Sequence, residues 1–189
     1  MKEQIAEYVI SLYRDIPVEV YEGLLSVLCL GVVVIIACYG LKRGWRRIAG
    51  VLLVEYMFLI YCSTVIYRQG YERAGYKLSP FWSYTAIPYG RTELLAENIM
   101  NVVVFVPIGF LLVAGIKGLK CWYALLIGFC LSSSIEILQF VFKKGVAETD
   151  DVMHNTVGCM IGYGIYKTGQ FMFEHFSIKT KKSRRHDAR

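Results

Sequence analysis

The sequence lacks the patterns that mark a disulfide framework, a zinc site or a nucleophilic triad. Its six cysteines include no CxxC pair and fall in or beside apolar stretches, so we interpret them as small packing or lipid-facing residues. No serine, cysteine and histidine pattern resembles a nucleophilic triad. The sequence also contains no internal repeat, low-complexity tract or separate soluble domain.

The N-terminus lacks the basic region and short apolar core of a cleaved signal peptide. Acidic residues are spread through its first 22 positions, so we expect the segment to be retained. Its apolar residues recur at helical spacing, which predicts an amphipathic or interfacial helix over residues 1–23, or a solvated helix packed on the first span. These residues are Ile5, Tyr8, Val9, Leu12 and Ile16.

What the sequence has in excess is apolar residues. They make up 56% of its 189 positions, compared with roughly 45–50% in soluble domains. Stretches of about 18 or more apolar residues are long enough to cross a hydrocarbon layer of about 30 Å. We therefore predict an all-α polytopic bundle of about five transmembrane helices. The expected spans are residues 24–41, 48–67, 99–116, 121–142 and 152–166.

Basic residues set the expected orientation. The loop after the first span contains a cluster of lysine and arginine, and the positive-inside rule places it in the cytoplasm. The N-terminus is then outside. Residues 24–67 form two N-terminal helices, residues 68–98 an extracytoplasmic loop, and residues 99–166 a three-helix core. The prolines and aromatics of the loop suit an interfacial or re-entrant segment.

Residues 167–189 form the expected basic cytoplasmic tail, which carries much of the net charge of +6. Beside a terminal span, such a cluster favours contact with anionic lipid headgroups. Nothing else in the sequence is typical of a nucleic-acid reader. We therefore expect membrane lipid as a partner and no nucleic acid.

Polar residues inside the last three spans are the candidates for a functional site. A charged side chain in mid-span costs roughly 2.5–3.5 kcal/mol on insertion scales, so it usually faces protein or water. Ser132, Glu136 and Gln139 share one face of the fourth helix. Glu136 lies about 9 Å from the outer end of its span, and Asn101 and Asn155 lie about 5 Å from theirs. Their shared depth predicts one extracytoplasmic pocket.

The predicted ligand-binding set of this pocket combines amides and carboxylates from three spans. It consists of Asn101, Glu136, Gln139, Asp150, Asp151 and Asn155. The amides are equally interpretable as interhelical contacts, whereas a lone carboxylate such as Glu136 favours function. Small or helix-breaking residues of the third and fifth spans are assigned to helix packing. These are Pro107, Gly109, Gly158 and Gly162.

Chemistry at this pocket is a weaker expectation. Glu136 and Asp151 are the candidate catalytic acid or base. Asp150, Asp151 and His154, with Glu136 opposite, contain enough ligands for a divalent metal. Acidic residues at a helix N-terminus are also favoured by the helix macrodipole alone, so we assign no metal and no cofactor. We identify no role for Glu55 in the second span.

Three ordered segments resemble the VanZ-like family. They are residues 101–110, which contain Pro107 and Gly109, residues 133–139, and residues 149–163; residues 78–81 resemble the segment before the family's first matching span. The resemblance covers about residues 78–166. It implies a multi-pass protein of the bacterial plasma membrane, and the family's best-known member confers teicoplanin resistance. One departure is Ala147-Glu148, where relatives often carry another acidic residue one position earlier.

The leading hypothesis is a glycopeptide-resistance or cell-envelope protein whose outer-leaflet polar pocket engages a lipid-like ligand. The ligand would be a lipid-linked wall precursor or the acyl tail of a lipoglycopeptide. One alternative is a membrane-embedded enzyme that modifies a lipid-linked envelope precursor. A small transporter is another, although few polar residues continue towards the cytoplasmic side.

The expected orientation is tested by cysteine labelling with a membrane-impermeant maleimide. In a chain whose native cysteines are replaced, Ser183→Cys in the tail is expected to react only after permeabilisation, because the basic cluster holds the tail inside. Ser79→Cys in the loop is the matched control and is expected to react in intact cells. Labelling of position 183 in intact cells would show that the tail is outside and that the predicted orientation is reversed.

Overall fold

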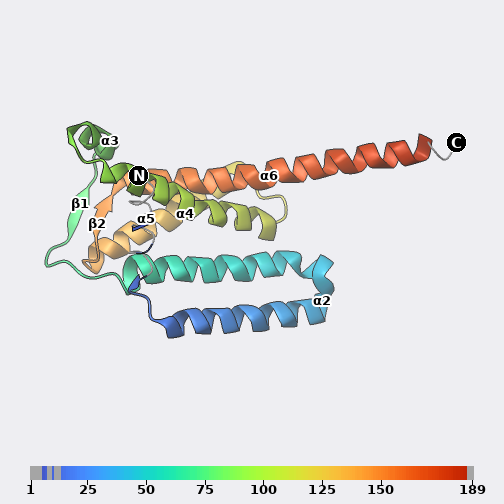
Figure 1. Ribbon diagram of the computed structural model, residues 1–189, viewed down its shortest axis with the longest axis horizontal. Helices are drawn as coiled ribbons and strands as arrows, with labels where there is room; N and C mark the ends of the chain where they lie inside the picture. The colour runs from blue at the N-terminus through green and yellow to red at the C-terminus, as the bar shows by residue number, and fades with distance from the viewer. Residues whose placement is uncertain (1–5, 8–9, 11–13, 187–189) are drawn as a thin grey trace.

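The protein is a bundle of long helices with a small mixed substructure at one end (Figure 1). The computed structural model describes residues 6–7, 10 and 14–186, with side chains except at residues 41–43 and 176–186. The long helices are α2 (Val18–Tyr61), α4 (Glu93–Gly115), α5 (Cys121–Val141) and α6 (Thr149–His186). Shorter elements are a π-helical turn (Cys62–Ile66), β1 (Gly75–Lys77), α3 (Trp82–Ala86), a 3₁₀ turn (Ile87–Tyr89) and β2 (Val146–Glu148).

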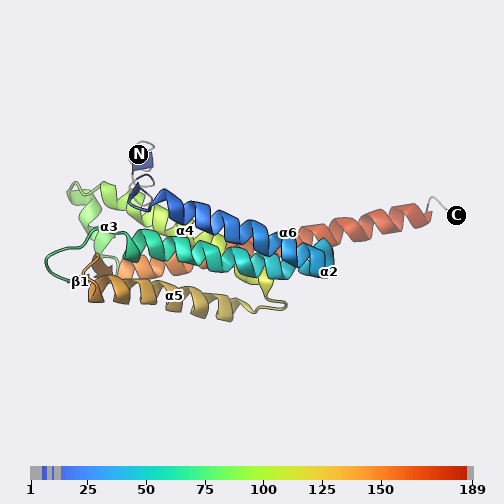
Figure 2. The ribbon, with the colours of Figure 1, turned by 90° about the horizontal axis from the view of Figure 1, so that it is seen from below.

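Helix α2 is two antiparallel arms joined at Gly40. This glycine has φ 66° and ψ 158°, a conformation that side chains with a Cβ rarely adopt. The arms lie side by side in both views (Figures 1 and 2), and Gly31 of the first arm faces Val51 of the second. The first arm buries none of its most apolar stretch against the described protein. Its exposed apolar side chains therefore suit a lipid environment.

Four helices among the described residues are long and apolar enough to cross a membrane. They are Val18–Gly40, Gly44–Ile66, Glu93–Gly115 and Cys121–Val141. The prediction of an all-α polytopic bundle is therefore confirmed, while its orientation stays a prediction. Helix α6 is not one of the four, although it packs in the bundle beside α4. Its crossing of the membrane also stays a prediction.

Several helices extend beyond the predicted spans, because apolar content does not decide where a helix ends. Helix α2 begins at Val18 rather than residue 24, and α4 begins at Glu93, inside the predicted loop. Helix α6 runs to His186, so the described part of the predicted tail is helical. Backbone hydrogen bonding continues through polar residues with good helix propensity. Of the five apolar residues on which the predicted N-terminal helix rests, only Ile16 lies within the described residues.

A two-stranded parallel pairing is the one departure from an all-helical chain among the described residues. Gly75, Tyr76 and Lys77 of β1 align with Val146, Ala147 and Glu148 of β2. The pairing ties the loop after α2 to the segment just before α6. Figures 1 and 2 place β1 and α3 at one end of the bundle, opposite the C-terminal end of α6. We call this end the loop end.

The close contact of α4 and α6 organises the bundle, and it is the most extensive helix pair. A Cβ built on Gly109 would lie 1.8 Å from the Cys159 carbonyl oxygen. The corresponding distances are 2.0 Å from Gly158 to the Val102 oxygen and 1.9 Å from Gly162 to the Val106 oxygen. Only glycine fits at these three positions, as expected where transmembrane backbones pack directly. The buried side chains around this contact include Phe105, Ile108, Leu112, Ile135 and Cys159.

Gly158→Ala is expected to lower the unfolding temperature of the protein in detergent or nanodiscs. Its Cβ would meet a backbone carbonyl, which cannot move as a side chain does, and overpacking costs roughly 1–3 kcal/mol. Gly164→Ala is the matched control on the same helix, because a Cβ there meets nothing within 4 Å. Equal melting temperatures for the two variants would contradict this account of the α4–α6 contact.

Candidate functional site

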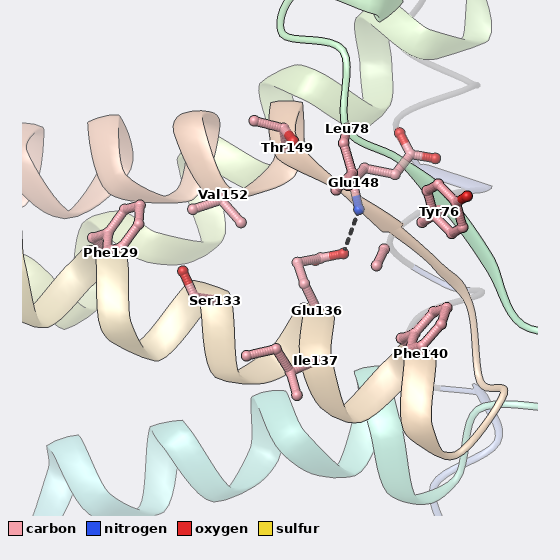
Figure 3. Close-up of a pocket in the computed structure, with 11 residues that line it drawn as sticks. Tyr76, Leu78, Phe129, Ser133, Glu136, Ile137, Phe140, Glu148, Thr149 and Val152 are labelled. Carbon is pink, nitrogen blue, oxygen red and sulfur yellow. Dashed lines mark hydrogen bonds between the residues drawn. The ribbon is translucent and has the colours of Figure 1, made fainter.

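An apolar groove of about 470 Å³ lies beside α5 near the loop end. Figure 3 shows α5 on one side of it, with β2 and the start of α6 facing. Its volume is in the range of roughly 300–1,000 Å³ that is usual for small-molecule sites. The helix α5 side supplies Phe129, Ser133, Glu136, Ile137 and Phe140, and the other side supplies Tyr76, Leu78, Ala147, Glu148, Thr149 and Val152.

Helical spacing places the α5 side chains along the groove. Phe129, Ser133, Glu136, Ile137 and Phe140 are separated by four, three, one and three residues, so they share one face of the helix. The first and last of them are eleven positions apart, which corresponds to about 16 Å along the axis. The groove therefore follows α5 from the loop end towards the middle of the bundle.

Glu136 is the buried carboxylate of this groove. It is 6% exposed, and its Oε2 accepts a hydrogen bond from the backbone N–H of Glu148 at 2.9 Å. Figure 3 shows the side chain reaching from α5 towards β2. The β1–β2 pairing fixes the position of this donor. A carboxylate has room for several hydrogen bonds, so Glu136 retains capacity for a ligand.

A second, polar cavity of about 50 Å³ also includes Glu136 in its lining. It is large enough for a small number of water molecules. Asn101, Gln139, Asp151 and Asn155 line it as well, from α4, α5 and α6. The structure therefore brings together five of the six residues of the predicted ligand-binding set. Glu136 lies at the boundary of an apolar space and a polar one.

Two amides of the polar cavity donate across helix interfaces. Asn101 Nδ2 donates to Asp151 Oδ1 at 2.7 Å, which joins α4 to α6. Asn155 Nδ2 donates to Ser132 Oγ at 2.8 Å, which joins α6 to α5. These bonds are the interhelical contacts that the sequence left open as an alternative. Because the same side chains line the cavity, assembly and ligand contact are compatible roles.

Arg68 is a residue of this cavity that sequence reasoning missed. It follows the π-helical turn Cys62–Ile66 and lines the cavity with Glu136. Gln139 Nε2 donates to the Thr64 carbonyl within that turn at 3.2 Å, and Lys144 Nζ donates to the Arg68 carbonyl at 2.8 Å. π-helical turns are frequent at functional sites. The sequence signal that could have identified Arg68 is its position directly after an apolar span, at the same end of the bundle as the acidic residues.

Glu148 is the other missed residue. Its backbone N–H binds Glu136, and its side chain lines the groove. Its Oε1 lies 3.5 Å from Lys77 Nζ, across the paired strands. Burial raises the pKa of the Glu148 carboxyl, and the Lys77 ammonium partly offsets that effect. The acidic position noted as a departure from the family pattern therefore lies at the groove itself.

Asp150 points away from both cavities and instead anchors the loop. One carboxylate oxygen accepts the backbone N–H of Phe81, and the other accepts the backbone N–H of Ser83 at 3.0 Å and the Ser83 hydroxyl at 2.6 Å. Phe81 has a left-handed φ of 63° and no side-chain cap on α3. Asp150 therefore accepts hydrogen bonds from the N-terminus of α3, which lies about 70 positions earlier in the sequence.

His154 also lies apart from the two cavities. Its Nε2 is 2.7 Å from the Tyr84 hydroxyl, while Asp150 binds α3 and Asp151 binds Asn101. The candidate metal set Asp150, Asp151 and His154 is thus not brought together. The described residues contain no group of three or more His, Cys, Asp or Glu side chains placed to hold a metal ion.

Residues 27–173 match the model of the VanZ/LLP1 family. Over 84 residues the chain is 34% identical to a curated protein of Enterococcus faecium named Protein VanZ. The aligned region is 44% of this chain and 52% of that relative, so the chain spans about half the length of the curated relative that it matches. No solved structure matches the chain.

Asp150→Asn is expected to loosen the loop that forms one side of the groove. Each hydrogen bond to a charged group contributes about 1.5–3 kcal/mol, and the amide places an N–H against one of the donors. Hydrogen exchange of residues 79–86 is therefore expected to accelerate. Ser83→Ala removes one of the three donors to Asp150 and also the acceptor of the Asn98 amide, and it is expected to give a smaller change because both backbone donors to Asp150 remain. Unchanged exchange in Asp150→Asn would contradict the anchoring role.

Proposed function

Because this chain belongs to the VanZ/LLP1 family, we propose that it is a multi-pass protein of the bacterial plasma membrane with a role in glycopeptide resistance or cell-envelope homeostasis. It acts by holding a lipid-like ligand in the groove beside Glu136. The family match covers most of the chain. The resistance role is proposed because the VanZ-like resemblance implies it. The likeness to Protein VanZ covers about half of that relative.

The apolar groove with one buried carboxylate is the observation that carries this proposal. Phe129, Ile137 and Val152 offer an apolar surface along α5 and α6, which suits an acyl chain. A chain that arrives from water gains roughly 0.8 kcal/mol for each buried CH₂. One that arrives from the bilayer gains little, because lipid tails are as apolar as the groove. Selectivity among lipids then depends on the polar residues Glu136 and Glu148.

The predicted orientation places the loop end on the extracytoplasmic side. Both cavities are near that end, since they involve the last turns of α5 and the first turns of α6. Lipid-linked wall precursors and glycopeptides meet in that compartment. A lipid-linked wall precursor and the acyl tail of a lipoglycopeptide are therefore the proposed occupants.

A membrane-embedded enzyme is the second candidate, and the position of Glu136 favours it. This carboxylate lines both the groove and the polar cavity, so a water molecule in the cavity and a ligand in the groove would have a general base between them. The discriminating result is a change in the envelope lipid profile after deletion. Binding alone predicts an unchanged profile.

The proposed function is tested by deletion and complementation, with glycopeptides that do and do not carry an acyl chain. Wild-type complementation is expected to raise the inhibitory concentration of the acylated drug, teicoplanin, more than that of a non-acylated one. Glu136→Gln, which removes the charge, and Ile137→Trp, which fills the groove, are expected to lose this protection.

Two matched substitutions control for effects on folding and insertion. Glu97→Gln changes a half-buried glutamate near the loop end that lines neither cavity, and Ile161→Trp changes an exposed apolar residue of α6. Both are expected to protect as the wild type does. Full protection by Glu136→Gln and Ile137→Trp at wild-type membrane levels would overturn the proposed function.

A further inference from the structure

The charged side chains that line the groove are all acidic. They are Glu136 and Glu148, and no lysine, arginine or histidine lines the groove among the described residues. Lys77, which lies between the groove residues Tyr76 and Leu78 in the sequence, is 3.5 Å from Glu148 Oε1 and 3.4 Å from the centre of the Trp82 ring. Lys77 is therefore engaged with the loop and offsets Glu148. The groove remains without a cation of its own.

Glu136 is the carboxyl group that this arrangement leaves for a ligand. It is 6% exposed, and its one described hydrogen bond uses Oε2 and a backbone N–H. The cation on its other side, Arg68, lines the polar cavity and not the groove. Uncharged polar groups also line the groove, and they include the hydroxyls of Ser133 and Thr149.

Charge and hydrogen bonding at Glu136 favour one class of head group. A phosphate beside this carboxylate would place two negative charges together in a region of low dielectric, where like charges repel strongly. A primary ammonium supplies the opposite charge and three donors, and charge-assisted hydrogen bonds of this type are among the strongest in proteins. The apolar residues Phe129 and Ile137 lie on the same face of α5, within reach of the chain of the same molecule.

We infer that the groove selects amphiphiles with a protonated amine head group over those with a phosphate head group, the ammonium binding Glu136 and the chain following α5. This inference rests on the proposed function, because it assigns the head group of the lipid-like ligand. It disfavours an occupant whose chain is joined directly to a phosphate, as in a lipid-linked wall precursor, and favours one with a free amine.

The test compares two probes with the same chain, dodecylamine and dodecyl phosphate. Full-length protein in phosphatidylcholine nanodiscs is titrated with each at neutral pH, and binding is followed by thermal shift and native mass spectrometry. Wild type is expected to bind dodecylamine at least about tenfold more tightly, which corresponds to about 1.4 kcal/mol. Glu136→Gln is expected to remove the difference.

Two further variants separate a charge effect from a structural one. Glu148→Gln retains the backbone N–H that binds Glu136 and is expected to reduce the preference partly. Glu97→Gln changes a residue that lines neither cavity and is expected to keep the full preference. It serves as the control for dodecylamine that accumulates in the bilayer without binding the groove.

The outcomes distinguish this inference from the proposed function. Equal affinities for the two probes, or a preference that persists in Glu136→Gln, would overturn the head-group inference and leave the groove as a lipid site. Failure of both probes to bind wild type, or binding that Ile137→Trp leaves unchanged, would overturn the lipid site and the inference with it.

Discussion

The direct contact between the backbones of α4 and α6 is the constraint on which the rest of the structure depends. A Cβ at Gly109, Gly158 or Gly162 would lie within 2.0 Å of a carbonyl oxygen, so the helix separation is set by the absence of side chains. Between two helices that both lie in lipid, such close packing would take the place of the hydrophobic force that assembles soluble bundles. It also brings Asn101 to Asp151. The polar cavity therefore forms beside the close contact of these two helices.

The groove depends on a second assembly step, in which the loop docks on the bundle. Asp150 at the start of α6 holds α3, and the β1–β2 pairing places the Glu148 N–H at Glu136. One side of the groove thus belongs to the bundle and the other to the docked loop. A carboxyl group on a long apolar helix usually requires a partner from protein or water, and Glu136 has one in the backbone N–H of Glu148, which lies in β2.

Helical periodicity explains why much of the site could be predicted. Ser132, Glu136 and Gln139 share a face by spacing alone, and all three are buried. Asp150 and Asp151 show the limit, because adjacent helical residues point about 100° apart. Whether Asp150 or Asp151 lines the polar cavity depends on where α3 docks, and no local sequence pattern predicts that position. The strands are three residues long, too short for a period-two pattern to identify them.

Helix α6 is longer than a lipid bilayer is thick. Its 38 residues correspond to about 57 Å at 1.5 Å per residue, whereas a bilayer with its headgroups is about 40–45 Å thick. A helix that starts at one headgroup layer and crosses perpendicular to the membrane therefore projects about 12–17 Å beyond the other. If α6 crosses in this way, its last described turns would stand clear of the lipid surface as a continuous helix and not as a loose tether.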